Sequence, residues 1–150
     1  MKKTFKEFAS ACEEVLKLQG VPEEKLCEPI QEGKWSVREI IGHLYYWDKF
    51  NLERMLPDMH DGADLRKFPD HDEHNAEAIS FLQDEPVEAI VDRFVETRQV
   101  LTGKLVSLDG NMRFTIGGGK RKLSVESFTK IFVKHDTHHL KQIAEKLSEN

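Results

Sequence analysis

The chain has 150 residues, of which 33% are charged, and it carries a formal net charge of -5 with a pI near 5.8. A chain of this length is one ordinary domain that can bury a hydrophobic core without disulfides or a structural metal. Its lysines are scattered among acidic residues and form no basic patch of the kind that binds a phosphate backbone. We therefore expect a single domain over residues 1–150 and no nucleic-acid partner.

The sequence also bears on location. The N-terminus has no apolar segment of the signal-peptide type, and no later stretch approaches the length of a membrane span. Cys12 and Cys27 form no Cys-x-x-Cys motif, and Cys12 lies in an apolar helical stripe. We expect a soluble, cytoplasmic protein with reduced cysteines, with Cys12 in the core and no membrane partner.

The first two helices have clear start and stop signals. Apolar residues repeat at intervals of three and four over about 4–19, and the segment 20–22, with its glycine and proline, ends this first helix. Ser36 and Glu39 have the spacing of a capping box, in which each side chain binds the backbone N–H of the other residue. This box predicts the start of the second helix, and Pro57 predicts its end.

The segment 57–74 is polar, lacks periodicity and is long for a connection within a bundle. Such a segment can cross the bundle, so that the helices on either side of it run parallel. Its histidines, His60, His71 and His74, lie among aspartates and suggest a second metal site. We favour a solvated loop instead, because no regular element holds them in place.

The third helix is predicted in two pieces, 75–82 and 86–105, with a break or kink where Pro86 enters the first turn. After it, the β-prone segments 112–116 and 121–123 flank a run of three glycines. This pattern predicts a small hairpin-like loop before the last helix.

Ser124 is a cap for a fourth helix that runs to about Leu147. Four amphipathic helices in a domain of this length predict an all-α fold, a four-helix bundle. Four aromatic residues lie at or near the second helix, and core or interface roles are more usual for them than substrate stacking. Of these, Tyr45 and Tyr46 are expected to face outward, where they would contribute to a homodimer interface.

Three histidines form the candidate site. His135 and His139 are four residues apart and project from one face of the fourth helix, which is the spacing that two imidazoles need to share a metal ion. Helical geometry places His139 inward, His135 at the edge and His138 outward, with His43 at the rim of the second helix's apolar stripe. We predict a three-histidine metal site with positions open to water or ligand, as in catalytic sites. The alternative is that these are ordinary half-buried side chains.

Two segments carry a resemblance to a known family: 35–44, followed by Asp48, and 135–143. They resemble the signature regions of the DinB/YfiT-like superfamily of bacterial metal-binding proteins. The resemblance covers essentially the whole chain and implies an up-down-down-up four-helix bundle with a long crossover between helices two and three. It also implies that a divalent metal, often nickel or zinc, is bound by one histidine of the second helix and a His-x-x-x-His pair of the fourth. By position these are the same three histidines.

The resemblance leaves the reaction open. Some family members resemble metal-dependent hydrolases, some are S-transferases that use a low-molecular-weight thiol such as bacillithiol, mycothiol or glutathione, and many have no known activity. It therefore implies a metal-dependent enzyme, either a thiol S-transferase or a hydrolase, that acts on a small molecule. The alternative is a non-catalytic metal-binding or stress-associated interaction protein.

Four further residues lie near the predicted site. Glu39 and His138 are candidates for a general base, although Glu39 is already a capping residue, which favours thiol chemistry or plain metal binding slightly. Asp48 and Asp136 face the inner sides of their helices. Each is a candidate to orient an imidazole N–H, and the alternative is pairing with a buried Arg, Thr or Asn.

Overall fold

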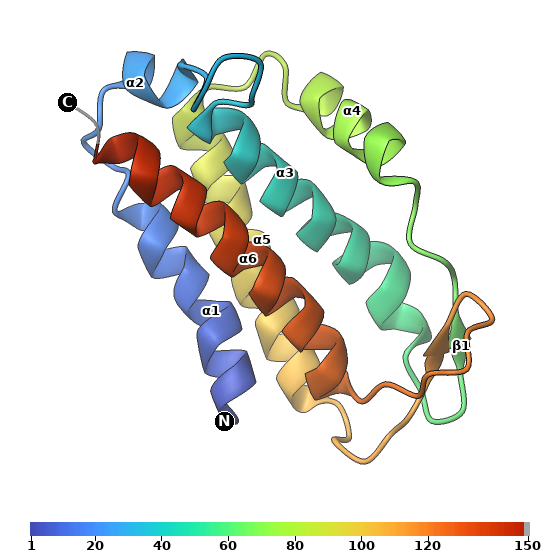
Figure 1. The fold of residues 1–150 in the computed structure, drawn as a ribbon. Coiled ribbons are helices and arrows are strands. Elements are labelled where there is room, and N and C mark those ends of the chain that lie inside the picture. Colours follow the sequence, from blue (N-terminus) through green and yellow to red (C-terminus); the bar gives the residue numbers. More distant parts are fainter. Residues whose placement is uncertain (149–150) are drawn as a thin grey trace.

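The computed structural model describes residues 1–148. Figure 1 shows the long helices packed side by side, with the first and last running one way and the middle two the other. In chain order the directions are up, down, down and up, which confirms the predicted all-α bundle. The four helices are α1 (Lys3–Leu16), α3 (Val37–Phe50), α5 (Val87–Ser107) and α6 (Val125–Leu147).

Helix α3 begins at the predicted capping box. The Ser36 hydroxyl accepts a hydrogen bond from the Glu39 N–H at 3.2 Å, and the Glu39 carboxylate accepts one from the Ser36 N–H at 3.1 Å. After Phe50 the chain stays helical through a π-helical turn, Asn51–Met55, and a short 3₁₀ turn, Leu56–Asp58. The helical path ends within this 3₁₀ turn, which contains Pro57, so the predicted end at Pro57 is confirmed.

The crossover between α3 and α5 contains a helix of its own, α4 (His71–Phe81). Asp70 caps it, because its carboxylate accepts a hydrogen bond from a first-turn backbone N–H at 3.0 Å. The prediction of a solvated loop up to residue 74 was wrong for His74, which is 4% exposed. Its ring packs against Trp47 with centroids 4.2 Å apart. His60 and His71 are exposed.

The predicted third helix is not one kinked helix. α4 and α5 are separate, and they run in opposite directions (Figure 1). The chain reverses at 82–86, where Arg38 of α3 donates hydrogen bonds to the Leu82 and Glu85 carbonyls. Pro86 then stands at the N-cap of α5, where its missing N–H costs no hydrogen bond.

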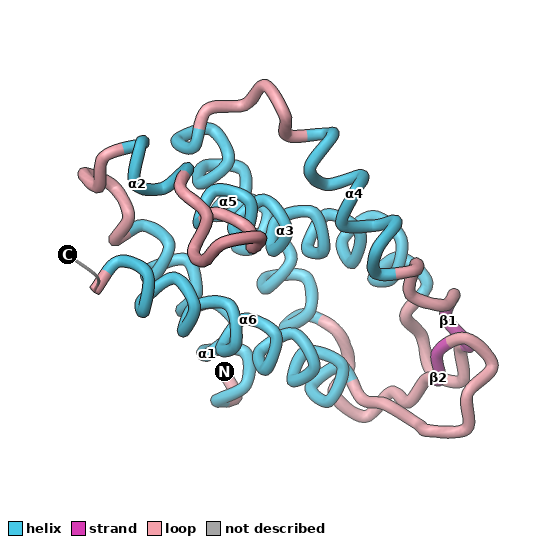
Figure 2. The backbone as a smooth tube through the Cα atoms, turned by 45° about the horizontal axis from the view of Figure 1, so that its top comes forward, coloured by secondary structure: helices cyan, strands magenta, loops and turns pink. Residues whose placement is uncertain are grey.

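A small β structure closes one end of the bundle (Figure 2). Phe114 and Leu123 form an antiparallel bridge, which confirms the predicted pairing of 112–116 with 121–123. In addition, β2 (Thr115–Ile116) pairs in parallel with β1 (Asp64–Leu65) of the crossover. Strand β1 was not predicted, since a two-residue strand is too short to show alternation.

Two apolar clusters fill the bundle. One contains Phe8, Leu101 and Phe128, and the other contains Val15 and Ile40. Cys12 is buried, as predicted. The prediction that Tyr45 faces outward was wrong, since Tyr45 is buried in the second cluster, whereas Tyr46 is half-buried. The homodimer remains a prediction.

Within residues 1–148, no helix is both long enough and apolar enough to cross a membrane.

Candidate metal centre

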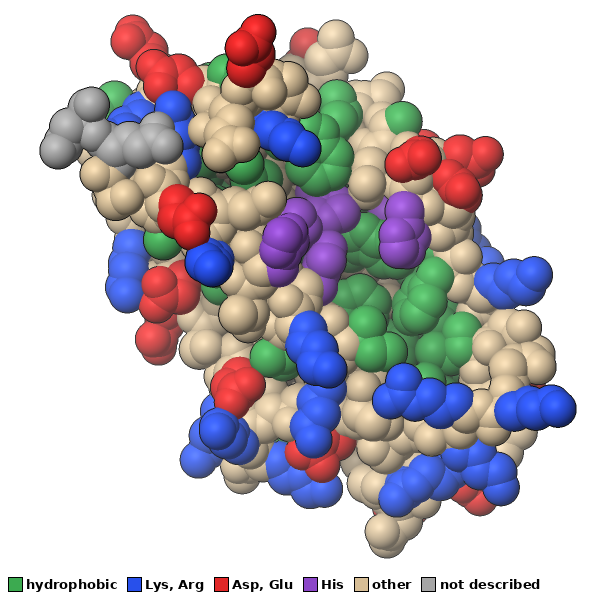
Figure 3. Space-filling model, in the orientation of Figure 1, with side chains coloured by type: hydrophobic (Ala, Val, Ile, Leu, Met, Phe, Trp, Pro, Cys, Tyr) green, Lys and Arg blue, Asp and Glu red, His purple; other side chains and the backbone are tan. Residues whose placement is uncertain are grey.

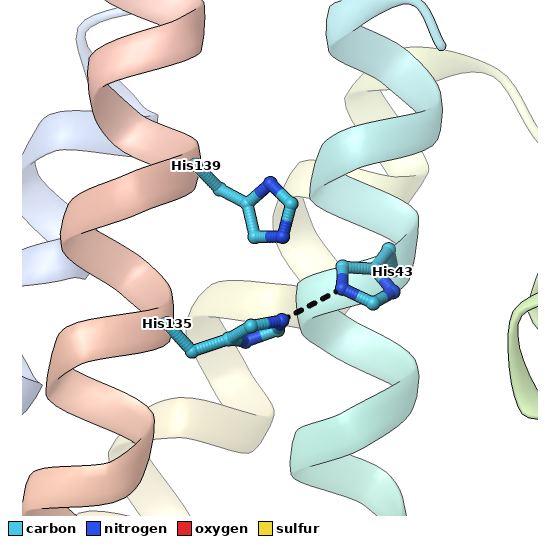
Figure 4. A group of neighbouring side chains, drawn as sticks. All are labelled: His43, His135 and His139. Atoms are coloured by element: carbon cyan, nitrogen blue, oxygen red, sulfur yellow. Dashed lines mark hydrogen bonds between the residues drawn. The ribbon is translucent and has the colours of Figure 1, made fainter. Parts of the chain in front are cut away.

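Helices α3 and α6 bring His43, His135 and His139 together. One ring nitrogen from each of these residues lies within 4.8 Å of the other two. Figure 4 shows the three rings pointing toward one another across the space between the two helices. The closest pair is Nε2 of His43 and Nε2 of His135, which are 2.8 Å apart. The structure thus assembles the three histidines that the sequence selected.

The three rings differ in exposure. His43 is 6% exposed, and its ring packs against Trp35 with centroids 4.9 Å apart. His135 and His139 are half-buried. His138 is exposed on the outer side of α6, as its position on the helix predicted, and its ring lies beside that of His139 with centroids 5.0 Å apart.

The environment keeps the three imidazoles neutral. Burial, followed by the neighbouring His135 and His139 rings, lowers the pKa of His43 to about 3. Burial, followed by His139 and Arg98, lowers the pKa of His135 to about 4. Burial also lowers the pKa of His139. At neutral pH all three rings are therefore in the form that binds metal ions.

The Nδ1 atoms of His139 and His43 differ in their hydrogen bonds. Nδ1 of His139 lies 2.8 Å from the Gln142 side-chain oxygen, so the ring donates from Nδ1 and keeps a lone pair on Nε2. Nδ1 of His43 is buried without a partner. Tetrahedral Zn–N bonds of about 2.0 Å place two ligand nitrogens roughly 3.3 Å apart. The observed separations between the ring nitrogens, from 2.8 Å up to 4.8 Å, bracket this value. Small ring movements would therefore suffice to bind an ion.

One side of the group is open. A cavity of about 180 Å³ lies against His139. Figure 3 shows the histidine side chains gathered at a hollow in this face of the molecule, with hydrophobic side chains next to them. A ligand can therefore approach the His139 ring from solvent. The cavity is lined by Ile30, Gly33, Lys34, Trp35, Ile40, His139 and Gln142.

Asp48 and Asp136 bind Arg98 rather than an imidazole. Nε of Arg98 donates to Asp48 at 2.7 Å, and Nη1 donates to Asp136 at 2.7 Å. Nη2 donates to both, at 3.1 and 3.0 Å. Of the alternatives for these aspartates, pairing with a buried arginine is the one observed. All three residues are buried.

Comparison with known proteins identifies the family. Residues 7–143, which are most of the chain, match the DinB superfamily. The chain belongs to the DinB superfamily. Among solved structures, it is similar to YfiT from Bacillus subtilis, described as a probable metal-dependent hydrolase with an unusual four-helix bundle topology. The TM-score is 0.72 at 17% identity, over 97% of this chain and 87% of that chain. At this identity the likeness shows the fold alone. Comparison with curated proteins gives no match.

In this DinB-superfamily protein, neither candidate for a general base lies between the three rings. Oε1 of Glu39 accepts hydrogen bonds from both the N–H and the hydroxyl of Ser36, so it belongs to the helix cap. His138 is exposed on the outer face. Gln142 was not among the predicted site residues, although its position three residues after His139 is within reach on a helix.

Proposed function

We propose that the protein is a divalent-metal-dependent enzyme that acts on a small molecule at His43, His135 and His139. The observation that carries this proposal is the convergence of three neutral imidazoles from two helices beside an open cavity. Structural zinc sites are closed by four protein ligands, whereas catalytic sites have three and an open position. Among residues 1–148, no fourth His, Cys, Asp or Glu joins this group.

The donor set is consistent with the proposed metal. Neutral imidazoles suit zinc and nickel among the divalent ions, and we propose one of these two. A bound ion of this kind supplies Lewis acidity, which lowers the pKa of water or of a thiol. The chain's own contribution is to hold the three rings, to orient His139 through Gln142, and to shield one wall of the cavity with Trp35 and Ile40.

Two reactions have separate support. Hydrolysis is one candidate, because YfiT, which shares this fold, is described as a probable metal-dependent hydrolase. The engagement of Glu39 in the helix cap supports thiol S-transfer with a cofactor such as bacillithiol, because that reaction does not need a carboxylate base beside the metal. We expect either reaction to take place in the cytoplasm, where low-molecular-weight thiols are kept reduced.

The first experiment is elemental analysis of untagged protein purified without chelators. We expect about one equivalent of nickel or zinc in the wild type, and none in a folded His135→Ala, His139→Ala double variant. His138→Ala is the matched control, because it removes an exposed imidazole from the same helix. Absence of metal from the wild type, even after reconstitution, contradicts the proposal.

Activity assays then separate enzyme from binding protein. The metal-loaded wild type and a His43→Ala variant are screened with ester and amide substrates, and with electrophiles in the presence of a low-molecular-weight thiol. We expect the wild type to turn over one of these classes and the folded variant to lose turnover. A loaded protein that turns over neither class favours the alternative, a non-catalytic metal-binding or stress-associated interaction protein.

A further inference from the structure

One ring nitrogen of the three-histidine group is buried without a hydrogen-bond partner. Nε2 of His43 faces His135, but Nδ1 of the same ring is buried without a hydrogen bond. A buried imidazole N–H without an acceptor is costly. A metal ligand usually meets this need by donating its second ring N–H to an oxygen, which also sets the tautomer and the ring orientation.

The structure offers an acceptor on the neighbouring crossover helix. His43 of α3 and Asn75 of α4 line the same small cavity, of about 10 Å³, which has room for at most one water molecule. The side-chain oxygen of Asn75, Oδ1, is buried and also lacks a partner.

The other polar side chains at this cavity are already engaged. The Glu39 carboxylate accepts hydrogen bonds from Ser36, and Arg38 donates to carbonyls at the end of α4. Among the described residues that line the cavity, Asn75 Oδ1 and His43 Nδ1 are thus the two buried side-chain polar atoms left without partners. One is an acceptor and the other carries a proton in one of the two neutral tautomers.

We propose that Asn75 is a positioning residue for the metal site: its Oδ1 accepts a hydrogen bond from Nδ1–H of His43, directly or through one water molecule. This bond keeps the proton on Nδ1 and leaves the Nε2 lone pair free to bind the ion. Gln142 has the same relation to His139, where the 2.8 Å contact is formed in the structure. The inference rests on the proposed metal function.

This arrangement fixes the protons of the metal-free site. When His43 carries its proton on Nδ1, its Nε2 is an acceptor, so the 2.8 Å contact requires that His135 donates from Nε2. On metal binding, His135 must move that proton to its own Nδ1 through solvent, and the ring stays neutral. Only His135 changes tautomer, while Asn75 holds His43 ready.

The test measures tautomers and metal affinity separately. In metal-free wild-type protein at neutral pH, ¹⁵N NMR is expected to show His43 protonated on Nδ1 and unprotonated on Nε2. Asn75→Leu keeps a similar volume but removes the acceptor, so His43 becomes a mixture of tautomers and Zn²⁺ affinity falls roughly 10- to 100-fold. Asn75→Asp keeps an acceptor oxygen and is expected to restore both readouts. Ser80→Ala, an exposed change on α4, is the control.

Each outcome decides the proposal. Wild-type His43 protonated on Nε2, or an Asn75→Leu variant with wild-type tautomer and affinity, would overturn it. If Asn75→Leu does not fold, the wild-type spectrum and Asn75→Asp still give the answer. If the wild type binds no metal but the His43 tautomer depends on Asn75, the hydrogen bond stands and the proposed metal function fails.

Discussion

Two buried polar groups lie close together in this bundle, and they differ in how fully their hydrogen bonds are made. Arg98 has five N–H donors, and all five are used, by Asp48, Asp136 and the Phe8 carbonyl. In the histidine group, by contrast, two rings share one contact and His43 keeps an unpartnered Nδ1. A cluster in which every hydrogen bond is made, here called saturated, has no free polar atom for a ligand. An unsaturated cluster keeps polar atoms that can bind one.

The saturated Arg98 cluster also helps to position the histidine group. Asp48 lies five residues after His43 on α3, and Asp136 follows His135 on α6. Because Arg98 binds both carboxylates, it links the two helices that carry the histidines. It is also joined to α1 through the Phe8 carbonyl and lies over the Phe8 ring at 3.8 Å. We infer that the ion cluster holds α3 and α6 in the register that makes the three rings meet.

The largest effect is expected for Arg98→Met. This change leaves two buried carboxylates without their cation, and breaking a buried ion pair in this way costs about 3–5 kcal/mol of unfolding free energy. Urea unfolding at neutral pH measures the loss. Arg93→Met is the matched control on the same helix, because Arg93 pairs with Glu85 at the surface and such pairs contribute less than about 1 kcal/mol. Equal losses in the two variants would mean that the cluster has no special role.

A metal is expected to stabilise only the histidine group. A divalent ion that binds the folded state at 100 times its Kd raises the unfolding free energy by about 2.7 kcal/mol. We expect this increase with Zn²⁺ or Ni²⁺ in the wild type and none in the folded His135→Ala, His139→Ala variant. Thermal unfolding with and without the ion gives the measurement. Equal stabilisation of both proteins would place the ion elsewhere.

In the metal-free protein, the two groups are expected to change the free energy of unfolding with pH in opposite directions. The pKa of His43 is lowered to about 3 in the fold, so the unfolded chain binds more protons below pH 6.5. Stability is therefore lost as pH falls, by about 2 kcal/mol at pH 5 for this residue. Burial raises the pKa of Asp48 to about 6, although Arg98 opposes the shift, so this residue acts in the opposite direction.

A variant isolates the histidine contribution. His43→Gln keeps Asp48 and its opposing effect, so the wild type is expected to lose about 2 kcal/mol more than the variant between pH 7 and pH 5. Urea unfolding of both metal-free proteins at the two pH values provides the comparison. Parallel pH profiles would show that His43 is not held neutral by the fold.

The same contrast explains what the sequence could predict. The helices, the cap at Ser36 and the positions of the three histidines follow from local periodicity, which is present in the chain itself. The choice of Arg98 as the partner of Asp48 and Asp136 is tertiary, because several polar residues could have met the inner faces of α3 and α6.

The crossover was the least predictable part. Helix α4 buries few residues, so its sequence has little amphipathic signal and its start was missed. His74 was therefore expected in solvent, although it is packed against Trp47. Asn75, on the same helix, is far from His43 in sequence, and no periodic pattern connects the two residues. Its approach depends on how the crossover folds back over α3.

The smallest effect on folding is expected for Gln142→Leu. This variant is also the sharpest test of the histidine group. Gln142 is half-buried, so losing its amide should change unfolding free energy by less than about 1 kcal/mol. Its oxygen nevertheless accepts the hydrogen bond from His139 Nδ1, which orients a metal ligand. We expect roughly 10-fold weaker Zn²⁺ binding, measured by competition with a chelator. Gln142→Glu retains an acceptor and should bind at least as tightly as the wild type. If instead the leucine variant binds normally, His139 is held in place by packing alone, and the group is less dependent on its amide partners than the ion cluster is on Arg98.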